Sequence, residues 1–82
     1  MRDRIRRGDQ VFLKDGGEEV GAVRDVRFRD HEIVVNIENA GDFTIREEAI
    51  RAVHSNKVLL DFEKLERALK DAVRHAHDAE DG

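Results

Sequence analysis

The stretch from Gly16 to Phe28, GGEEVGAVRDVRF, constrains the fold of this chain more than any other. It begins with two glycines, which can take the positive φ angles that tight hairpin turns require. It continues as the longest strand-like run in the sequence, with apolar and polar side chains in alternation. Arg24 falls on the apolar side of this alternation and Val23 on the polar side. We therefore predict a bulge or a sharp bend near Gly21 to Arg24, where a small barrel must curl.

Shorter runs before and after this stretch also have the pattern of strands, and turn residues separate them. The clearest alternation runs from Glu32 to Glu38, with Ile33, Val35 and Ile37 on one face. The period changes at Arg46 to Ile50, which predicts a single helical turn. The expected strands cover residues 10–13, 19–29, 32–38, 43–45, 51–54 and 58–60.

The alternation divides the apolar side chains into an inward and an outward set. The outward set is Phe12, Val34 and Leu59, one on each of three strands. Small soluble monomers rarely leave such a patch in water, so we predict that the C-terminal helix or a second subunit covers it. The inward set fills the barrel and comprises Val11, Leu13, Val20, Val26, Phe28, Ile33, Val35, Ile37, Phe43, Ile45, Val58 and Leu60.

The pattern becomes helical after Asp61 and stays so to about Asp78. Asp61 is a favourable N-cap residue for this helix. Apolar residues recur at helical spacing and form one narrow stripe that includes Leu65, Leu69 and Val73. A helix of this kind gains most of its stability by packing, so we expect the stripe to be covered.

A chain of 82 residues forms one domain with a small core. We expect a β-barrel over residues 1–61 and an amphipathic helix with an acidic tail over residues 62–82. The chain has no cysteine, so neither disulfides nor thiolate metal sites reinforce it. No apolar run reaches the roughly 18 residues of a membrane helix, and the N-terminus lacks an apolar signal segment. We therefore expect a cytoplasmic protein that does not insert into a membrane.

No group of residues has the spacing that catalysis or metal binding needs. His75 and His77 are two positions apart, so a helix would point them to opposite sides rather than toward one zinc ion. Thr44 and Ser55 stand outside any nucleophile motif such as GxSxG. A general acid or base needs burial or a close partner to shift its pKa, and the carboxylates lie mostly at outward or turn positions. We predict no enzymatic activity, no cofactor and no metal site.

Two segments of the sequence resemble the PRC-barrel family. In that family a strand with the pattern V-G-x-V-x-D-V follows a glycine turn, and here the residues are VGAVRDV. Further on the family has I-P-x-x-A-V and a closing K-V-x-L strand, and here FTIREEAIRAV precedes KVLL. The likeness covers about Gly8 to Leu60. Arg46 stands where the family usually has proline, so the rigid start of that turn is lost.

The resemblance implies a compact, strongly bent antiparallel barrel of five or six strands. Relatives in this family include the cytoplasmic domain of the photosynthetic reaction centre H subunit and the C-terminal domain of the ribosome maturation factor, and both act by binding other macromolecules. The likeness therefore implies a binding role. The membrane helix of the first relative and the partner domain of the second have no counterpart here, so neither partner is carried over.

We therefore expect a non-enzymatic protein-interaction or assembly module of the PRC-barrel type. It should form a homodimer, because its core is thin and its helical stripe is heptad-like, and it should bind a protein partner that the sequence does not identify. The expected contact surface combines the outward apolar set, the helical stripe and an arginine row: Phe12, Val34, Leu59, Leu65, Leu69, Val73, Arg27 and Arg29.

The alternative function is a ribosome- or RNA-associated module of the SH3-like or KOW type. The turn from Glu18 to Val23 also resembles those barrels, and binding would use Arg24, Arg27, Arg29 and the N-terminal arginines. The net charge of −4 speaks against a general nucleic-acid binder, which normally has an excess of basic residues. A small-ligand or metal-responsive protein is a third, less favoured reading.

Overall fold

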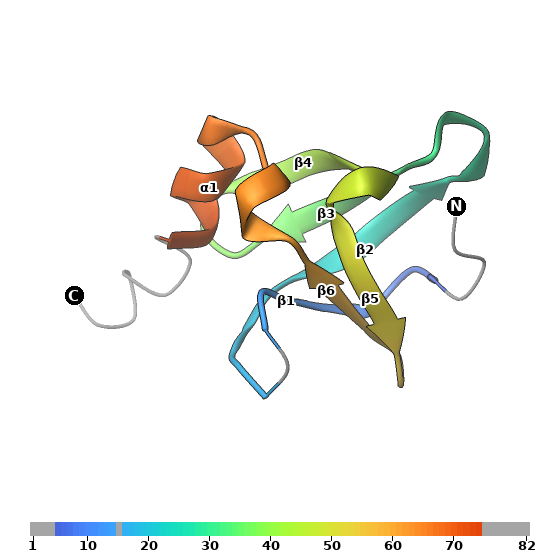
Figure 1. Cartoon of the computed structure of the whole chain (residues 1–82), viewed down its shortest axis with the longest axis horizontal. Coiled ribbons are helices and arrows are strands. Elements are labelled where there is room, and N and C mark those ends of the chain that lie inside the picture. The colour runs from blue at the N-terminus through green and yellow to red at the C-terminus, as the bar shows by residue number, and fades with distance from the viewer. Residues whose placement is uncertain (1–4, 15, 75–82) are drawn as a thin grey trace.

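The computed structural model describes residues 5–14 and 16–74, which form one strongly curled sheet followed by a single helix (Figure 1). This confirms the mainly β fold with a C-terminal helix. The strands are β1 (Gln10–Phe12), β2 (Glu19–Arg27), β3 (Glu32–Ile37), β4 (Gly41–Arg46), β5 (Ile50–His54) and β6 (Lys57–Leu60). The helix is α1 (Arg67–Arg74), and the short 3-10 turns are η1 (Phe28–Asp30), η2 (Glu47–Ala49) and η3 (Phe62–Lys64).

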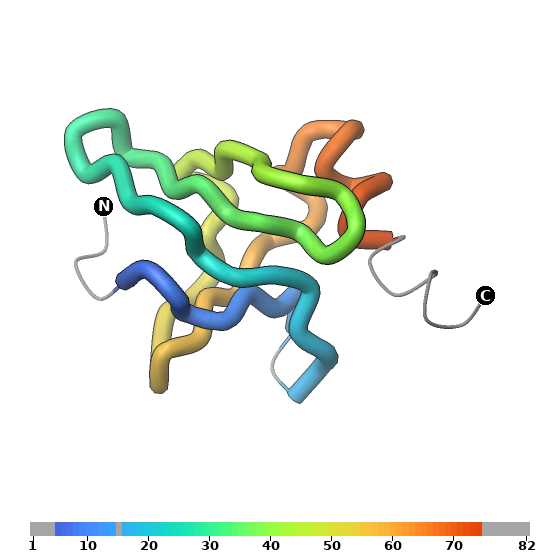
Figure 2. The backbone as a smooth tube through the Cα atoms, turned by 180° about the vertical axis from the view of Figure 1, so that it is seen from behind, coloured from blue at the N-terminus to red at the C-terminus, as the bar shows by residue number. Residues whose placement is uncertain are grey.

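The six strands lie in the order β4-β3-β2-β1-β6-β5. Neighbours are antiparallel except β1 and β6, which are parallel, so the sheet is mixed rather than wholly antiparallel as the sequence suggested. The outermost strands, β4 and β5, do not pair with each other, and the sheet is a half-barrel. Figure 2 shows the β3–β4 hairpin in green running across the molecule, with β5 and β6 crossing at a steep angle.

Three irregularities in the strand pairing bend the sheet. The β2–β3 register shifts between Val23 and Asp25, which leaves Arg24 without a partner residue on β3. This confirms the bend that the broken alternation predicts. The β1–β2 register also shifts, and the β5–β6 register shifts at Arg51. Because each bulge bends its strand and increases the local twist, the three together account for the curl.

The bulge at Arg24 also reverses which side chains of β2 face the core. Val23 is 3% exposed and lies opposite the buried Val35, although the simple alternation placed it outward. Phe28 was expected in the core, and this prediction is wrong: it is 50% exposed in η1. The phase beyond the bulge is as expected, since Val26 lies opposite the buried Ile33, but the strand ends at Arg27 and Phe28 opens a 3-10 turn, where the alternation no longer applies.

Most of the expected interior is otherwise correct. Leu13, Val26 and Phe43 are partly buried against the core cluster. The fully buried members of the expected set are Val11, Val20, Ile33, Val35, Ile37, Ile45, Val58 and Leu60.

Gly21 lies in the bend of β2, at the point where the backbone of β3 comes closest. It is buried and faces Ile37 in the β2–β3 register. A Cβ atom at this position would overlap the carbonyl oxygen of Asn36. Only glycine permits so close an approach of two backbones. The glycine of the V-G step in the sequence therefore indicates a close contact between β2 and β3.

The helix begins later than the sequence suggested. Asp61 does act as a cap, since its Oδ1 accepts a hydrogen bond from the amide of Glu63 at 3.2 Å, but the cap opens η3. Leu65 then has an extended backbone with ψ of 148°, and α1 starts at Arg67. Residues three positions apart, such as Phe62 and Leu65, lie on the same side both in a 3-10 turn and in a continuous α-helix. The apolar spacing alone therefore does not distinguish a 3-10 turn followed by a helix from one longer helix. The expected continuation to Asp78 lies outside the described residues.

The apolar stripe of this segment closes the open side of the half-barrel. Leu65, Leu69 and Val73 are buried in the same core cluster as the barrel interior. The stripe therefore does not cover Phe12, Val34 and Leu59. Phe12 and Leu59 lie opposite each other on β1 and β6 and are 9% and 6% exposed within the chain, and Val34 is half-buried. No three-residue apolar patch remains for a helix or a second subunit to cover.

Replacing Leu69 with alanine should lower the free energy of unfolding by about 2–5 kcal/mol, because its side chain is 1% exposed in the core. Urea denaturation measures the change. The matched control is Arg67→Ala on the exposed side of α1, which should change the stability by less than about 0.5 kcal/mol. Equal stability of the Leu69→Ala variant and the wild-type protein would contradict the docked helix.

The Gly21→Ala substitution should destabilise the fold by about 3 kcal/mol or more, because β2 and β3 would have to move apart. Gly17→Ala is the control, since its Cβ would meet chiefly the side chain of Lys14, which can move aside. Chemical denaturation of both variants makes the comparison. Similar losses at the two positions would show that the β2–β3 approach is not specially close.

Candidate interaction edge

β4 is an end strand of the sheet, and among the strands that the structure describes it pairs with β3 alone. The amide of Glu47 donates to the carbonyl oxygen of His31 at 2.8 Å, which identifies this position as a hydrogen-bonded pair of the ladder. Such pairs alternate along an antiparallel ladder, so the backbone groups of Asp42, Thr44 and Arg46 face away from β3. We call these three residues the β4 edge. Among residues 5–14 and 16–74, no backbone bond outside the strand ladders involves them.

The two ends of the sheet differ in regularity. The β3–β4 register runs from Glu32 opposite Arg46 to Ile37 opposite Gly41 without a shift. β5, at the other end, carries the bulge at Arg51. Bulges and short strands protect sheet edges from pairing with other chains, because they disturb the row of donors and acceptors. β4 therefore offers a regular free edge, and β5 does not.

Side chains on the β4 edge carry charges of both signs. Asp42 accepts a hydrogen bond from Asn36 Nδ2 at 3.0 Å and lies 3.2 Å from Arg24 Nε. Arg46 Nε lies 3.6 Å from an oxygen of Glu48, and both side chains are exposed. Exposed pairs of this kind contribute only about 0–1 kcal/mol, so the two charges remain available to another partner.

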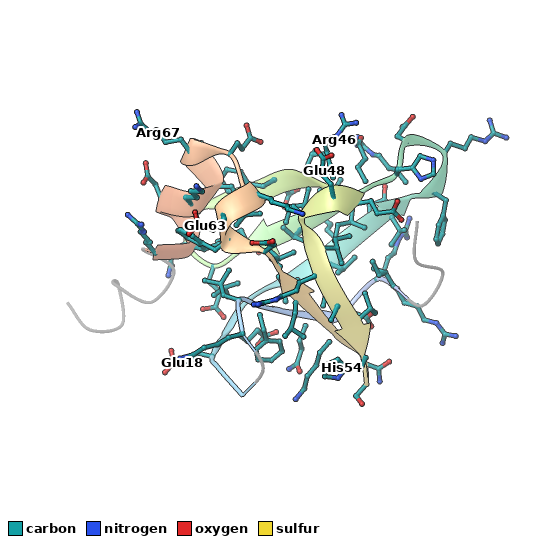
Figure 3. All side chains as sticks on the ribbon, viewed as in Figure 1. Glu18, Arg46, Glu48, His54, Glu63 and Arg67 are labelled. Carbon is teal, nitrogen blue, oxygen red and sulfur yellow. The ribbon has the colours of Figure 1, made fainter. Side chains whose placement is uncertain are left out.

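A groove with a cavity of about 250 Å³ runs beside this edge. One wall is β4 with η2, and the other is the segment that joins η3 to α1. Arg46 and Glu48 project from the rim, away from the core (Figure 3). The apolar lining consists of Ile45, Ala49, Leu65 and Leu69, and the polar lining of Thr44, Arg46, Glu48, Lys64 and Glu66. The groove thus combines an apolar floor with a charged rim.

The structure does not gather the expected contact residues on one surface. Arg27 and Arg29 are exposed, and Val34 is half-buried. Their role in binding stays a prediction. The remaining members are buried within the chain: Phe12, Leu59, Leu65, Leu69 and Val73. The β4 edge was missed because the alternation shows which β4 side chains point outward, but it does not show that β4 is an end strand.

The arginines assigned to RNA binding lie among carboxylates. Arg27 Nη1 is 3.3 Å from Glu32, and Arg24 pairs with Asp42. Arg7 Nη2 donates to Asp25 Oδ1 at 3.2 Å. A shallow cavity lies between these groups and includes Val34. Because acids and bases alternate here, these described side chains form no continuous basic patch of the kind that phosphate binding uses.

Asp25 is held in its ionised form by two contacts. The amide of Val26 donates to its Oδ1 at 2.9 Å, and this hydrogen bond is the main cause that lowers the pKa of the carboxyl group. The guanidinium of Arg7 lowers the pKa further. The Asp25 side chain is 43% exposed. The carboxylate is therefore an ion-pair partner at neutral pH.

An NMR titration of the Asp25 carboxyl carbon should give a pKa below the ordinary value of 3.8. Since the pKa is lower in the folded chain, ionised Asp25 stabilises the fold. This contribution is complete above the unfolded-chain pKa and is lost as the pH falls through the folded-chain pKa. Arg7→Gln should raise the pKa only partway, because the bond from Val26 persists. A pKa at or above 3.8 in the wild-type protein would contradict these contacts.

Neither a metal site nor a membrane-spanning helix competes with the β4 edge as a candidate functional site in the described part of the chain. Among the described residues, no three or more histidine and carboxylate side chains lie close enough to hold a metal ion. Within the same residues, no helix has the length and apolar character to cross a membrane. His75 and His77 lie outside the described residues.

Comparison with known proteins yields no relative. No family model matches the chain, and no curated protein and no solved structure matches it. The likeness to the PRC-barrel family therefore rests on the short motifs in the sequence, and it stays a prediction.

Proposed function

We propose that this protein is a non-enzymatic protein-interaction module of the PRC-barrel type, which binds another polypeptide along the β4 edge. The observation that carries the proposal is that β4 is a regular end strand whose free backbone groups border an apolar groove. An added strand would gain main-chain hydrogen bonds from the edge, and its side chains would contact the groove. The charges of Asp42 and Arg46 would select among partners.

The fold supports the PRC-barrel part of the proposal. The VGAVRDV segment forms the bent strand β2, with Gly21 against β3 and the bulge at Arg24. The REEA segment makes the single turn η2 after β4. Arg46 has φ of −79°, which is within the range that proline allows, so the backbone would accept the proline that the family usually has at this position. These features agree with what the motifs imply.

No observation favours the RNA-binding alternative. Arg24 and Arg27 lie in ion pairs with Asp42 and Glu32. The neighbouring carboxylates lower the local positive potential that would attract phosphates. We therefore keep protein binding as the proposed function.

The Arg46→Pro substitution tests the role of the edge. Proline fits the backbone at this position, and the Arg46 amide faces away from β3, so the fold should be unchanged or stabilised by less than about 1 kcal/mol. The substitution removes one donor from the edge. A tagged full-length chain should then recover fewer interacting proteins in native purification, as measured by quantitative mass spectrometry.

Arg46→Ala is the matched control for that experiment. It removes the same charge but keeps the backbone donor, so binding that depends on main-chain pairing should suffer less than in Arg46→Pro. Circular dichroism checks that both variants are folded. Recovery of the same proteins in the same amounts by the wild-type chain and the Arg46→Pro chain would reject the edge as the binding site.

A further inference from the structure

We infer that the polypeptide which pairs with the β4 edge is β4 of a second copy of this chain, in antiparallel register about a two-fold axis through Thr44. The inference rests on the proposed function, because it names the partner of the same edge. Five consecutive residues of β4, Asp-Phe-Thr-Ile-Arg from 42 to 46, carry the argument. Their order is an acid, an apolar residue, a threonine, an apolar residue and a base.

This order is self-complementary. A two-fold axis at Thr44 sets Thr44 opposite Thr44 of the second copy and Asp42 opposite Arg46 of the second copy, and the latter pair occurs twice. Opposite charges and threonine pairs are favourable across antiparallel strands. An axis at Asp42 or at Arg46 would set like charges opposite each other. The charge pattern therefore selects one register among those that β4 could form with itself.

The backbone is suited to the same register. In this register, hydrogen bonds between the two copies form at Asp42, Thr44 and Arg46. The backbone donors and acceptors of these same residues are the ones that β3 leaves free. β4 has no bulge that would interrupt the new ladder. Each copy would thus complete the free edge of the other, and the two half-barrel sheets would become continuous.

The apolar residues of β4 meet on the opposite face of the strand. In this register Phe43 of one copy faces Ile45 of the other. Ile45 is buried and forms part of the groove floor together with Leu65 and Leu69, while Phe43 is only partly buried in the single chain. The pairing directs Phe43 of the second copy toward the groove, and the two-fold axis provides this contact twice. A second copy therefore supplies a fitting side chain for the apolar groove.

The charges that would pair between copies are not sequestered within one chain. Asp42 uses one oxygen for Asn36 and the other for Arg24, and its side chain is 42% exposed. Arg46 is 72% exposed beside Glu48. Carboxylate oxygens accept more than one donor, so Arg46 of the second copy can join Arg24 at Asp42.

The sequence predicted a dimer through the helical stripe, but the stripe lies in the core of a single chain. The inferred dimer forms through β4 instead.

Two charge-reversal variants test this register. Position 42 of each copy lies opposite position 46 of the other. Asp42→Arg therefore places positive charges opposite each other at both contacts, and Arg46→Asp places negative charges opposite each other. Each variant alone should dimerise about tenfold more weakly than the wild-type chain, or worse. An equimolar mixture of the two variants restores opposite charges at both ends of the strand. It should form a heterodimer with an affinity close to that of the wild-type homodimer.

Native mass spectrometry, with an affinity tag on one variant to separate the masses, distinguishes homodimers from heterodimers, and sedimentation velocity gives the dissociation constants. The matched controls are Arg51→Asp on β5, at the other end of the sheet, and Asp30→Arg in the η1 turn; both positions are exposed, and the variants reverse the same charges away from β4. These controls should dimerise as the wild-type chain does. Circular dichroism establishes that every variant is folded.

Three results would overturn the inference. They are a wild-type chain that stays monomeric at about millimolar concentration, a dimer that neither variant weakens, and a mixture that fails to form the heterodimer. The proposed function has a separate outcome. If the wild-type chain is monomeric but the Arg46→Pro variant recovers fewer interacting proteins, β4 binds a different polypeptide. Unchanged recovery of other proteins by Arg46→Pro would reject the β4 edge as their binding site, whereas the charge-reversal variants decide whether the edge pairs with a second copy.

Discussion

The close approach of β2 to β3 at Gly21, followed two residues later by the start of the bulge, is the contact on which the rest of the structure depends. A side chain at Gly21 would collide with the backbone of β3, and the unmatched Arg24 lets β2 bend. The bend turns Val23 into the core and makes the sheet concave. The helix stripe then fills the hollow, while β4 and β5 remain apart at the two ends of the sheet. The free β4 edge is thus a consequence of how β2 curls.

Local pattern predicted the elements of this fold well, because strands, turns and caps depend on neighbouring residues. The break at Val23 and Arg24 located the bulge, and Asp61 was recognised as a cap. The end of β2 at Arg27 was not predicted, so Phe28, which lies in the η1 turn, was placed in the core. The parallel β1–β6 pair and the burial of Phe12 and Leu59 depend on which strands become neighbours. A single sequence does not carry that information.

The candidate site depends on the same distinction. The alternation in β4 already shows that Asp42, Thr44 and Arg46 share one face, and their charges can be read from the sequence. Only the strand order reveals that none of the described strands pairs with the other side of β4. The apolar stripe of the helix was expected to join two subunits, but it is buried in the core of a single chain. The proposed interaction surface of this protein is thus an unpaired strand edge rather than a patch of exposed apolar side chains.

Hydrogen exchange of the backbone amides in β4, followed by NMR at several protein concentrations, tests the pairing of this strand most directly. The amides of Phe43 and Ile45 face β3 and should exchange slowly at every concentration. The amides of Asp42, Thr44 and Arg46 should exchange rapidly in dilute solution and become protected as the concentration rises. Rapid exchange of these three amides at all concentrations would contradict self-association through β4.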